Sequence, residues 1–176
     1  MCKGRKMILC SIETERLVLR PLGVSDAGEM ESVLADVSLY EFTGGSPPTL
    51  DALTDLYRRQ TAGSGNPAEY WCNWIMRTKP DDRAVGFMQA TVVGRLADVA
   101  WVVGVNDQGR GLATEAATAA GRWLADNGVC RVVAHIHPRH TASQTVAERI
   151  GLVRTGELDG DGEEIWAAGD AADSRD

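Results

Sequence analysis

The chain has 176 residues, which is enough for one domain with a substantial hydrophobic core. Its hydrophobic fraction of 44% and charged fraction of 24% are typical of globular proteins. With a net charge of −7, it gains little from the counterion release that drives nucleic-acid binding. We therefore expect no nucleic-acid partner, and a tolerance for cationic partners instead.

The cysteines and the N-terminal segment bear on the cell compartment. None of the four cysteines forms a C-x-x-C pair or a zinc-site spacing, so we expect free thiols in a reducing compartment. The apolar run at 7–10 is far too short for a signal peptide or a membrane span. The sequence thus predicts a cytoplasmic protein without membrane contact. The cysteines are Cys2, Cys10, Cys72 and Cys130.

The chain shows no internal repeat and no low-complexity linker, so residues 1–176 are predicted to form a single domain. The tail at 169–176 is small, polar and acidic, and we expect it to be flexible. We expect the same of residues 1–10. The ordered elements are therefore predicted between these two ends.

The first half of the chain predicts one strand, two helices and then a run of strands. Residues 16–20 alternate in polarity and stop at Pro21, as a strand does. Apolar residues at helical spacing predict a helix from about 26 to 37. Thr49 is a suitable N-cap for a second helix at 50–61. Three strands follow, at 70–77, 84–93 and 96–105, with Gly94-Arg95 as the hairpin turn between the last two.

The second half alternates between helices and strands. An Ala-rich stretch predicts a helix at 112–127, and the near-continuous apolar run at 129–136 predicts a strand buried on both faces. Residues 141–144 fit a capping box that opens a helix ending at Gly151. A closing hairpin has its turn at 159–162. A mixed sheet flanked by helices is the economical arrangement of these elements.

One loop carries a binding signal. It lies between the strand at 96–105 and the helix at 112–127, and it contains Gly109 and Gly111. Successive backbone N–H groups in such a loop, together with the helix dipole, make a seat for a diphosphate. A Cβ would keep phosphate oxygens away from the backbone. The pattern is neither a Walker A loop nor a full G-x-G-x-x-G fingerprint, and the two glycines alone also fit a turn without a ligand.

The full loop reads Gln108-Gly109-Arg110-Gly111-Leu112-Ala113 and resembles the Q/R-x-x-G-x-G/A coenzyme A pyrophosphate loop of the GNAT acetyltransferase superfamily. Three further segments, in the same order along the chain, resemble motifs of the branch that contains the ribosomal-protein N-terminal acetyltransferases. The resemblance spans 13–166, with a gap at 40–70. The three segments are 13–27, 97–101 and 138–152.

The resemblance implies an α/β (α+β) fold with a mixed, mostly antiparallel sheet and a V-shaped splay between two parallel strands, flanked by helices. Acetyl-CoA would lie in the V, with its thioester carbonyl polarised by a backbone N–H near Val103. No metal is implied. Many relatives have Asn in place of His140, and some are dimers, so a homodimer is allowed. The implied cofactor-binding residues are Val103, Val105, Gln108, Gly109, Arg110, Gly111, Leu112, Ala113, Thr114, His140 and Ser143.

Direct attack of an amine on the thioester needs a base, because an amine of pKa about 8–10 is mostly protonated at neutral pH. Asp98 aligns with a glutamate of the family and would act through water; the alternative is a solvated strand carboxylate. Glu41 is a second candidate for the base. The tyrosine that often protonates the leaving thiolate is replaced by Ala147. Ser143 is then a candidate to position the sulfur or relay a proton, although it also suits a helix N-terminus.

The acceptor amine is the least specified partner. Aromatic and acidic residues before the cofactor loop suit a cationic, sugar-like amine, although the aromatics also suit a core. The first hypothesis is an N-acetyltransferase that inactivates an amino-sugar antibiotic such as an aminoglycoside. The second is acetylation of a protein N-terminus, and a remote third is a coenzyme-binding module without turnover. The candidate acceptor-binding residues are Tyr40, Glu41, Tyr70, Trp71 and Trp101.

Overall fold

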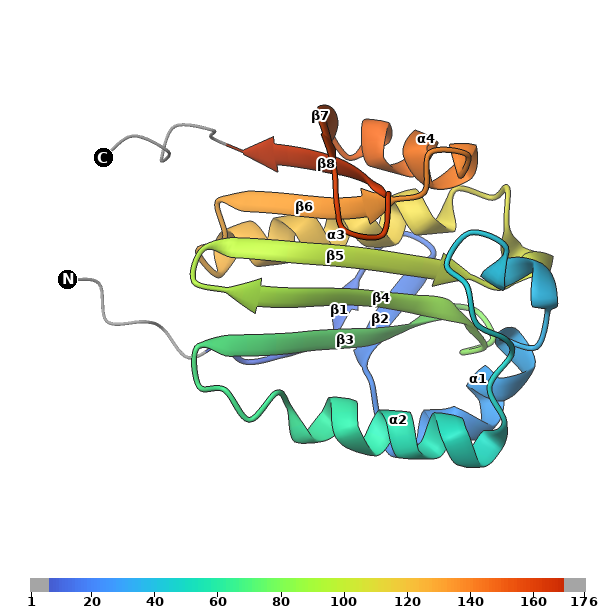
Figure 1. The fold of residues 1–176 in the computed structure, drawn as a ribbon. Coiled ribbons are helices and arrows are strands. Elements are labelled where there is room, and N and C mark those ends of the chain that lie inside the picture. The colour runs from blue at the N-terminus through green and yellow to red at the C-terminus, as the bar shows by residue number, and fades with distance from the viewer. Residues whose placement is uncertain (1–6, 170–176) are drawn as a thin grey trace.

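The computed structural model describes residues 7–169, which form an eight-stranded sheet with helices on both faces (Figure 1). The strand order is β1-β2-β3-β4-β5-β6-β8-β7, and within this sheet only β5 and β6 pair in parallel. The predicted mixed, mostly antiparallel sheet is therefore confirmed. The strands are β1 (Ile12–Glu13), β2 (Leu17–Pro21), β3 (Glu69–Thr78), β4 (Ala84–Val93), β5 (Leu96–Val103), β6 (Arg131–Ile136), β7 (Val153–Leu158) and β8 (Glu164–Gly169).

The helices divide between the two faces of the sheet. α1 (Ala27–Val33) and α2 (Leu50–Ala62) cover the front face in Figure 1, whereas α3 (Leu112–Asp126) and α4 (Thr141–Arg149) cover the back. Alternate side chains of each strand point to opposite faces, so each strand contributes to both cores. On β3, for example, Trp74 packs into the α3 core while Ile75 packs into the smaller α1–α2 core.

Helix ends show where local sequence signals held and where they failed. The Thr49 cap of α2 is confirmed, since its side chain accepts a hydrogen bond from the N–H of Ala52 at 3.3 Å. The first predicted helix stops at Val33, because Asp36 accepts the N–H of Ser38 and starts a separate 3-10 turn. The predicted strand at 96–105 stops at Val103, and a 3-10 turn occupies Val105–Asp107.

The predicted capping box at 141–144 is wrong. The N-cap of α4 is His140, one residue earlier, and it makes no side-chain capping bond. Gln144 instead turns its amide to the carbonyl of Pro138 at 2.8 Å. The side-chain carbonyl oxygen of Gln144, which a capping box would direct to the N-cap N–H, accepts from the guanidinium of Arg154 at 3.0 Å.

Part of the N-terminal stretch that we expected to be flexible contacts the core. Met7 and Leu9 pack against the α3 core, and the carbonyl of Cys10 accepts the indole N–H of Trp74 at 2.9 Å. Residues 1–6 and 170–176, which make up the rest of the two expected flexible ends, and with them Cys2, lie outside the described residues. Among residues 7–169 the cysteines are unpaired, and none of the helices there is both long and apolar enough to cross a bilayer.

Candidate active site

The sheet opens between its two parallel strands. The pairing of β5 with β6 runs over three residue pairs and ends where Asp98 meets Val133. Both strands continue past this point, β5 to Val103 and β6 to Ile136, but no further β5–β6 pairs form among the described residues. The predicted V-shaped splay is therefore present, with Asp98 at its base.

Backbone direction determines which groups face the V. The N–H of Gly104 donates to the carbonyl of Val85 on β4 at 2.9 Å. Because N–H directions alternate along an antiparallel strand, the N–H of Val103 points the other way, toward β6. It meets no acceptor on the described part of β6, so this edge is free to pair with an extended ligand chain. Val105, which we expected to share this role, lies beyond the strand in the 3-10 turn.

The predicted diphosphate loop has the expected backbone. Gly109 and Gly111 adopt φ angles of 71° and 76°, in the left-handed region that favours glycine, and α3 begins at Leu112. Within residues 7–169, no acceptor pairs with the backbone N–H groups of 109–114. These N–H groups and the positive end of the helix dipole form a site suited to an anion.

A buried carboxylate holds this loop in place. Asp107 is only 4% exposed and receives two hydrogen bonds from Arg83, at 2.7 and 2.9 Å, and one from Arg110 at 2.7 Å. The bonds from Arg83 lower the pKa of Asp107 below its usual range, so the carboxylate stays ionised. Gln108 turns inward, and its amide donates to the carbonyl of Val103 at 3.0 Å. Sequence reasoning missed Arg83 because it lies 24 residues from its partner.

A second anchor ties the loop to the N-terminal segment. Glu115, in the first turn of α3, accepts hydrogen bonds from the Thr14 hydroxyl at 2.5 Å and from the Arg16 side chain at 2.6 Å. The same arginine donates to the carbonyl of Arg110 at 2.8 Å. The segment at 13–16, which the sequence links to the loop only by resemblance, is thus in direct contact with it.

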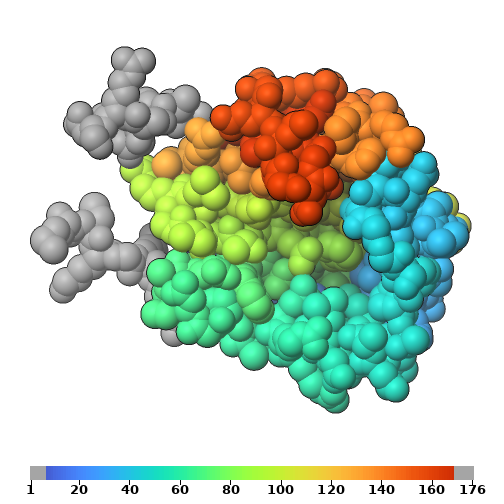
Figure 2. Space-filling model, viewed as in Figure 1, coloured from blue at the N-terminus to red at the C-terminus, as the bar shows by residue number. Residues whose placement is uncertain are grey.

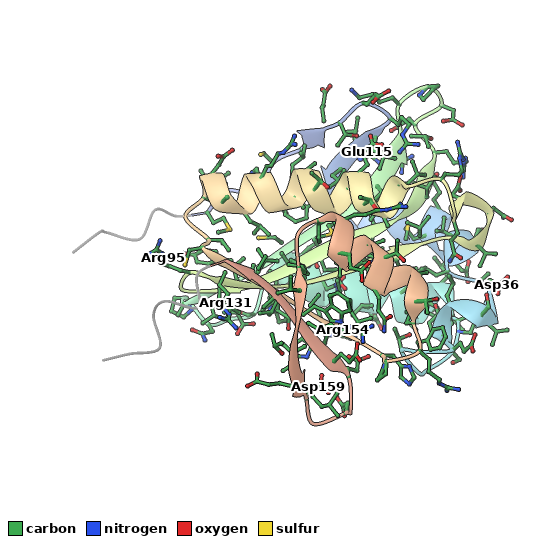
Figure 3. The ribbon with its side chains drawn as sticks, turned by 90° about the horizontal axis from the view of Figure 1, so that it is seen from above. Asp36, Arg95, Glu115, Arg131, Arg154 and Asp159 are labelled. Carbon is green, nitrogen blue, oxygen red and sulfur yellow. The ribbon has the colours of Figure 1, made fainter. Side chains whose placement is uncertain are left out.

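Three titratable side chains meet at the base of the V on the front face. Nε2 of His135 lies 3.6 Å from Oδ2 of Asp98, and its Nδ1 lies 2.7 Å from Oδ2 of Asp159. Figure 3 shows Asp159 on the β7–β8 hairpin, on the side of the sheet away from α3. Partial burial raises the pKa of Asp98, whereas hydrogen bonds, above all from the N–H of Glu163, lower the pKa of Asp159. His135 and Asp159 were not predicted as site residues. Asp159 lies in the β7–β8 turn, and only tertiary folding brings this turn to His135 on β6.

The other candidate base lies at the opposite end of the V. Glu41 is exposed and precedes Phe42, whose ring stacks on His140 with centroids 4.6 Å apart and lies 5.3 Å from the ring of His137. The segment before α2 therefore reaches across to the loop before α4. Burial, more than the neighbouring His137, lowers the pKa of His140, so its imidazole is neutral at pH 7. The structure does not bring Glu41 to Asp98.

Two positions on α4 bear on the thiol of the cofactor, Ser143 and Ala147. Ser143 lies half-buried in the first turn of α4, and one turn further on Ala147 is fully buried in the α3 core. A larger side chain at position 147 would therefore displace that core. Among residues 7–169, no group of three or more His, Cys, Asp or Glu side chains is arranged to hold a metal ion.

The predicted acceptor aromatics separate onto the two faces of the sheet. Trp71 lies on the front face with Asp98, as the strand register requires. Tyr70 and Trp101 lie on the back face and pack against the α3 core. Tyr40 stays within its own segment, where its hydroxyl donates to a backbone carbonyl at 3.0 Å. Of the aromatic candidates, Trp71 is therefore the one that shares a face with Asp98.

The front face is hollowed between the red β7–β8 hairpin, the blue segment before α2, and α2 itself (Figure 2). A cavity of about 80 Å³ extends beneath α2, between that helix and strands β3 and β4. Its lining is mostly apolar, with four leucines and Phe87. The other lining side chains are neutral and polar: Tyr57, Gln60, Asn73 and Gln89. The buried Tyr57 hydroxyl and Gln60 carbonyl have no hydrogen-bond partner among the described residues. Such groups are suited to hydroxyl or amide groups of a ligand.

Fold, splay and loop together define an acyl-CoA-dependent transferase, and comparison identifies its family. The family model described as an acetyltransferase (GNAT) domain matches residues 16–153, so the chain belongs to the GNAT acetyltransferases. It is an N-acetyltransferase that uses acetyl-CoA, as the loop motif predicted. No curated protein matches the chain in sequence.

Several solved structures share the fold at low sequence identity. A GNAT-family acetyltransferase from Bacillus anthracis is 20% identical, with a TM-score of 0.76 over 90% of this chain and 98% of that one. A putative ribosomal-protein-serine acetyltransferase from Vibrio cholerae is 15% identical, with a TM-score of 0.69 over 91% and 97%. The aminoglycoside acetyltransferase AAC(6')-Ib in complex with coenzyme A is 18% identical, with a TM-score of 0.71 over 87% and 94%.

Proposed function

We propose that the protein transfers the acetyl group of acetyl-CoA to a primary amine of a small cationic amino sugar of the aminoglycoside type. One observation carries this proposal: an anionic cluster and a cavity that contains four neutral polar side chains lie side by side on the same face of the sheet. The first suits an ammonium group, and the second suits sugar hydroxyls. Both lie next to the opening of the V, where the thioester would be held.

The anionic half of the site consists of Asp98, Asp159 and Glu163. Asp98 and Asp159 lie 3.6 and 2.7 Å from the ring nitrogens of His135, and Glu163 is on the same hairpin as Asp159. No Lys or Arg is hydrogen-bonded or ion-paired to any of the three among the described residues. A net charge of −7 adds a favourable field for a cation. A polycationic acceptor is attracted to such a face and binds with one ammonium at Asp98.

The polar half lies one strand pair away. Asp98 pairs with Thr91 on β4, and Gln89 lies two residues further along the same face. Side chains in this diagonal relation are about 7–8 Å apart, the span of one sugar ring. An amino sugar can therefore reach the carboxylates with its amine and the cavity with its hydroxyls.

The remaining residues fit acetyl-CoA. The free N–H groups of 109–114 would bind the pyrophosphate, and the open edge at Val103 would pair with the pantetheine amides. His140 and Ser143 would contact the cofactor from the loop before α4 and from its first turn. Acetyl-CoA supplies the activated acetyl group; the chain holds it at the V and keeps the amine next to it.

A second candidate, acetylation of a protein N-terminus, is supported by the openness of the front face. Trp71, Thr91, Asp98 and Ala100 are all exposed along it, which leaves room for an extended peptide. A peptide would use the carboxylates for its α-ammonium but would not need the polar cavity. The two candidates therefore differ in what the cavity contributes.

The first experiment follows thiol release from acetyl-CoA with a panel of aminoglycosides, polyamines and short peptides with free N-termini. We expect turnover on aminoglycosides to exceed that on polyamines, which carry charge without hydroxyls. Gln89→Leu should raise KM for the aminoglycoside about tenfold, equivalent to the loss of one hydrogen bond, and leave acetyl-CoA affinity unchanged. Turnover on peptides alone, insensitive to Gln89→Leu, would overturn the proposal in favour of the second candidate.

A further inference from the structure

The geometry points to His135 as the base that removes the proton from the acceptor amine, and to Asp159 as the residue that positions it. This inference rests on the proposed amine acetylation, but on neither of the two acceptors in particular. It replaces Asp98 and Glu41, the bases that the sequence favours. Asp98 then serves to bind the incoming ammonium rather than to deprotonate it.

His135 is placed where a base is needed. It follows the last β5–β6 residue pair by two positions on β6, so its side chain shares the front face with Asp98. About a third of that side chain is exposed. An ammonium bound at Asp98 would lie within reach of Nε2, because the carboxylate and this nitrogen are 3.6 Å apart.

Asp159 determines which imidazole nitrogen is basic. Its Oδ1 accepts the backbone N–H groups of Asp161 and Glu163, both at 2.9 Å, which fixes the carboxylate in the turn. Its Oδ2 lies 2.7 Å from Nδ1 of His135. An ionised carboxylate can only accept, so Nδ1 carries the hydrogen, and in the neutral imidazole Nε2 then keeps its lone pair. The same Asp–His relation orients the general base of serine hydrolases.

The chemistry of the alternatives favours the imidazole. A general base is most efficient when its pKa is near the working pH, and the reference values are about 6.5 for His and 3.9 for Asp. The groups that face His135 are Asp98 on β5 and Asp159 and Glu163 on the hairpin, with His137 beyond Glu163. All the near groups are carboxyls, which stabilise the imidazolium that forms when His135 takes a proton.

The step balances with the groups present. The ammonium bound at Asp98 first loses its extra proton to solvent, which gives the neutral amine. The amine nitrogen then forms its bond to the thioester carbonyl carbon as one of its remaining protons passes to Nε2 of His135. The carbon–sulfur bond breaks, and its electron pair leaves with sulfur as the thiolate. The imidazolium then returns the proton to the thiolate or to solvent. A dedicated acid is unnecessary, since a thiol of pKa about 8–9 is a good leaving group, which is consistent with Ala147 on α4.

The test compares His135→Gln with the wild type on whichever amine the wild type acetylates, small molecule or peptide. We expect kcat to fall about 100-fold, with acetyl-CoA affinity and thermal stability near the wild-type values. Wild-type kcat should rise with pH, and the limb that belongs to the general base should vanish in the variant while any limb set by the amine remains. Added imidazole should restore part of the activity of His135→Ala.

Asp159→Asn tests the positioning role without removing the turn. An asparagine can still accept the two backbone N–H groups, but its amide would donate to Nδ1 and force the hydrogen onto Nε2. We expect kcat to fall at least tenfold and the nitrogen-15 chemical shifts of His135 to report the exchanged tautomer. The matched control is Asp161→Asn, which removes the same charge from the same turn; kcat should stay within about twofold.

The outcomes separate the two proposals. If His135→Gln retains wild-type kcat and its pH limb, or if wild-type Nδ1 carries no hydrogen, the role of His135 is refuted whatever the acceptor is. If the aminoglycosides are inert but His135→Gln loses activity on peptides, the acceptor proposal fails and the base assignment stands. The tautomer measurement needs no acceptor, so it decides the arrangement even before turnover is found.

Discussion

At the scale of single residues, Asp107 connects two parts of the site that the sequence keeps apart. It joins Arg83 near the start of β4 to Arg110 in the diphosphate loop. Asp107→Asn leaves a buried amide facing two guanidinium groups. We expect a loss of about 2 kcal/mol in unfolding free energy, less than the roughly 3–5 kcal/mol of a fully buried pair because Arg83 is half-exposed. Urea unfolding measures this loss of stability, and the affinity of the variant for acetyl-CoA should fall as well.

The contribution of Asp107 to the unfolding free energy depends on pH, and its sign follows from the pKa shift. The pKa of Asp107 is lower in the folded than in the unfolded state, mainly because of Arg83. Its stabilisation is therefore complete above the unfolded value of about 3.9 and is lost as pH falls through the folded value. The stability difference between wild type and Asp107→Asn should shrink below about pH 4. A difference that stays constant to pH 2 would contradict this account.

Residue by residue, prediction succeeded where the cause is local. Thr49 caps α2 because its hydroxyl needs only the N–H three residues on, and the loop glycines adopt the conformation that glycine favours. The contact between His135 and Asp159 could not be predicted in this way. It depends on how far the β7–β8 hairpin leans over the sheet, which is set by the packing of the whole C-terminal part.

At the scale of elements, the junction between the loop and α3 depends on Gly111. Its φ of 76° is unfavourable for any β-branched residue, so Gly111→Val should destabilise the fold by about 1–2 kcal/mol and weaken acetyl-CoA binding at least tenfold. Gly121→Ala is the matched control on the same helix. Its Cβ would meet no atom within 4 Å, beside an apolar cavity of about 360 Å³. It should stabilise α3 by up to about 1 kcal/mol and leave affinity unchanged.

Titration of acetyl-CoA by calorimetry, with thermal unfolding of the same samples, measures both effects. Equal affinity in the two variants would mean that the loop conformation is irrelevant to binding.

Element boundaries show the same contrast between local and distant causes. The Ala-rich pattern predicts α3 almost to its last residue, whereas the helix expected at 26–37 breaks after Val33, where Asp36 competes for the backbone.

At the scale of the whole molecule, the sheet consists of two parts, β1–β5 and β6–β8, joined by three residue pairs. Hydrophobic periodicity predicts a mixed sheet but not where it splays, because an open strand edge has the same composition as a paired one. The resemblance of the loop motif to a known family supplied that feature. A ligand in the V would bridge the two parts of the sheet, so it should stabilise residues beyond those that it touches.

Hydrogen exchange can detect this bridging. Without a ligand, the N–H of Val103 faces the V, whereas the N–H of Val102 faces β4 and is paired. Acetyl-CoA bound at 100 times its dissociation constant stabilises the folded state by about 2.7 kcal/mol, which slows all globally exchanging amides alike. Val103 should slow by about tenfold more than Val102, because it also gains a direct partner. Equal slowing of the two amides would show that the chain of the ligand does not pair with β5, and that the open edge has another use.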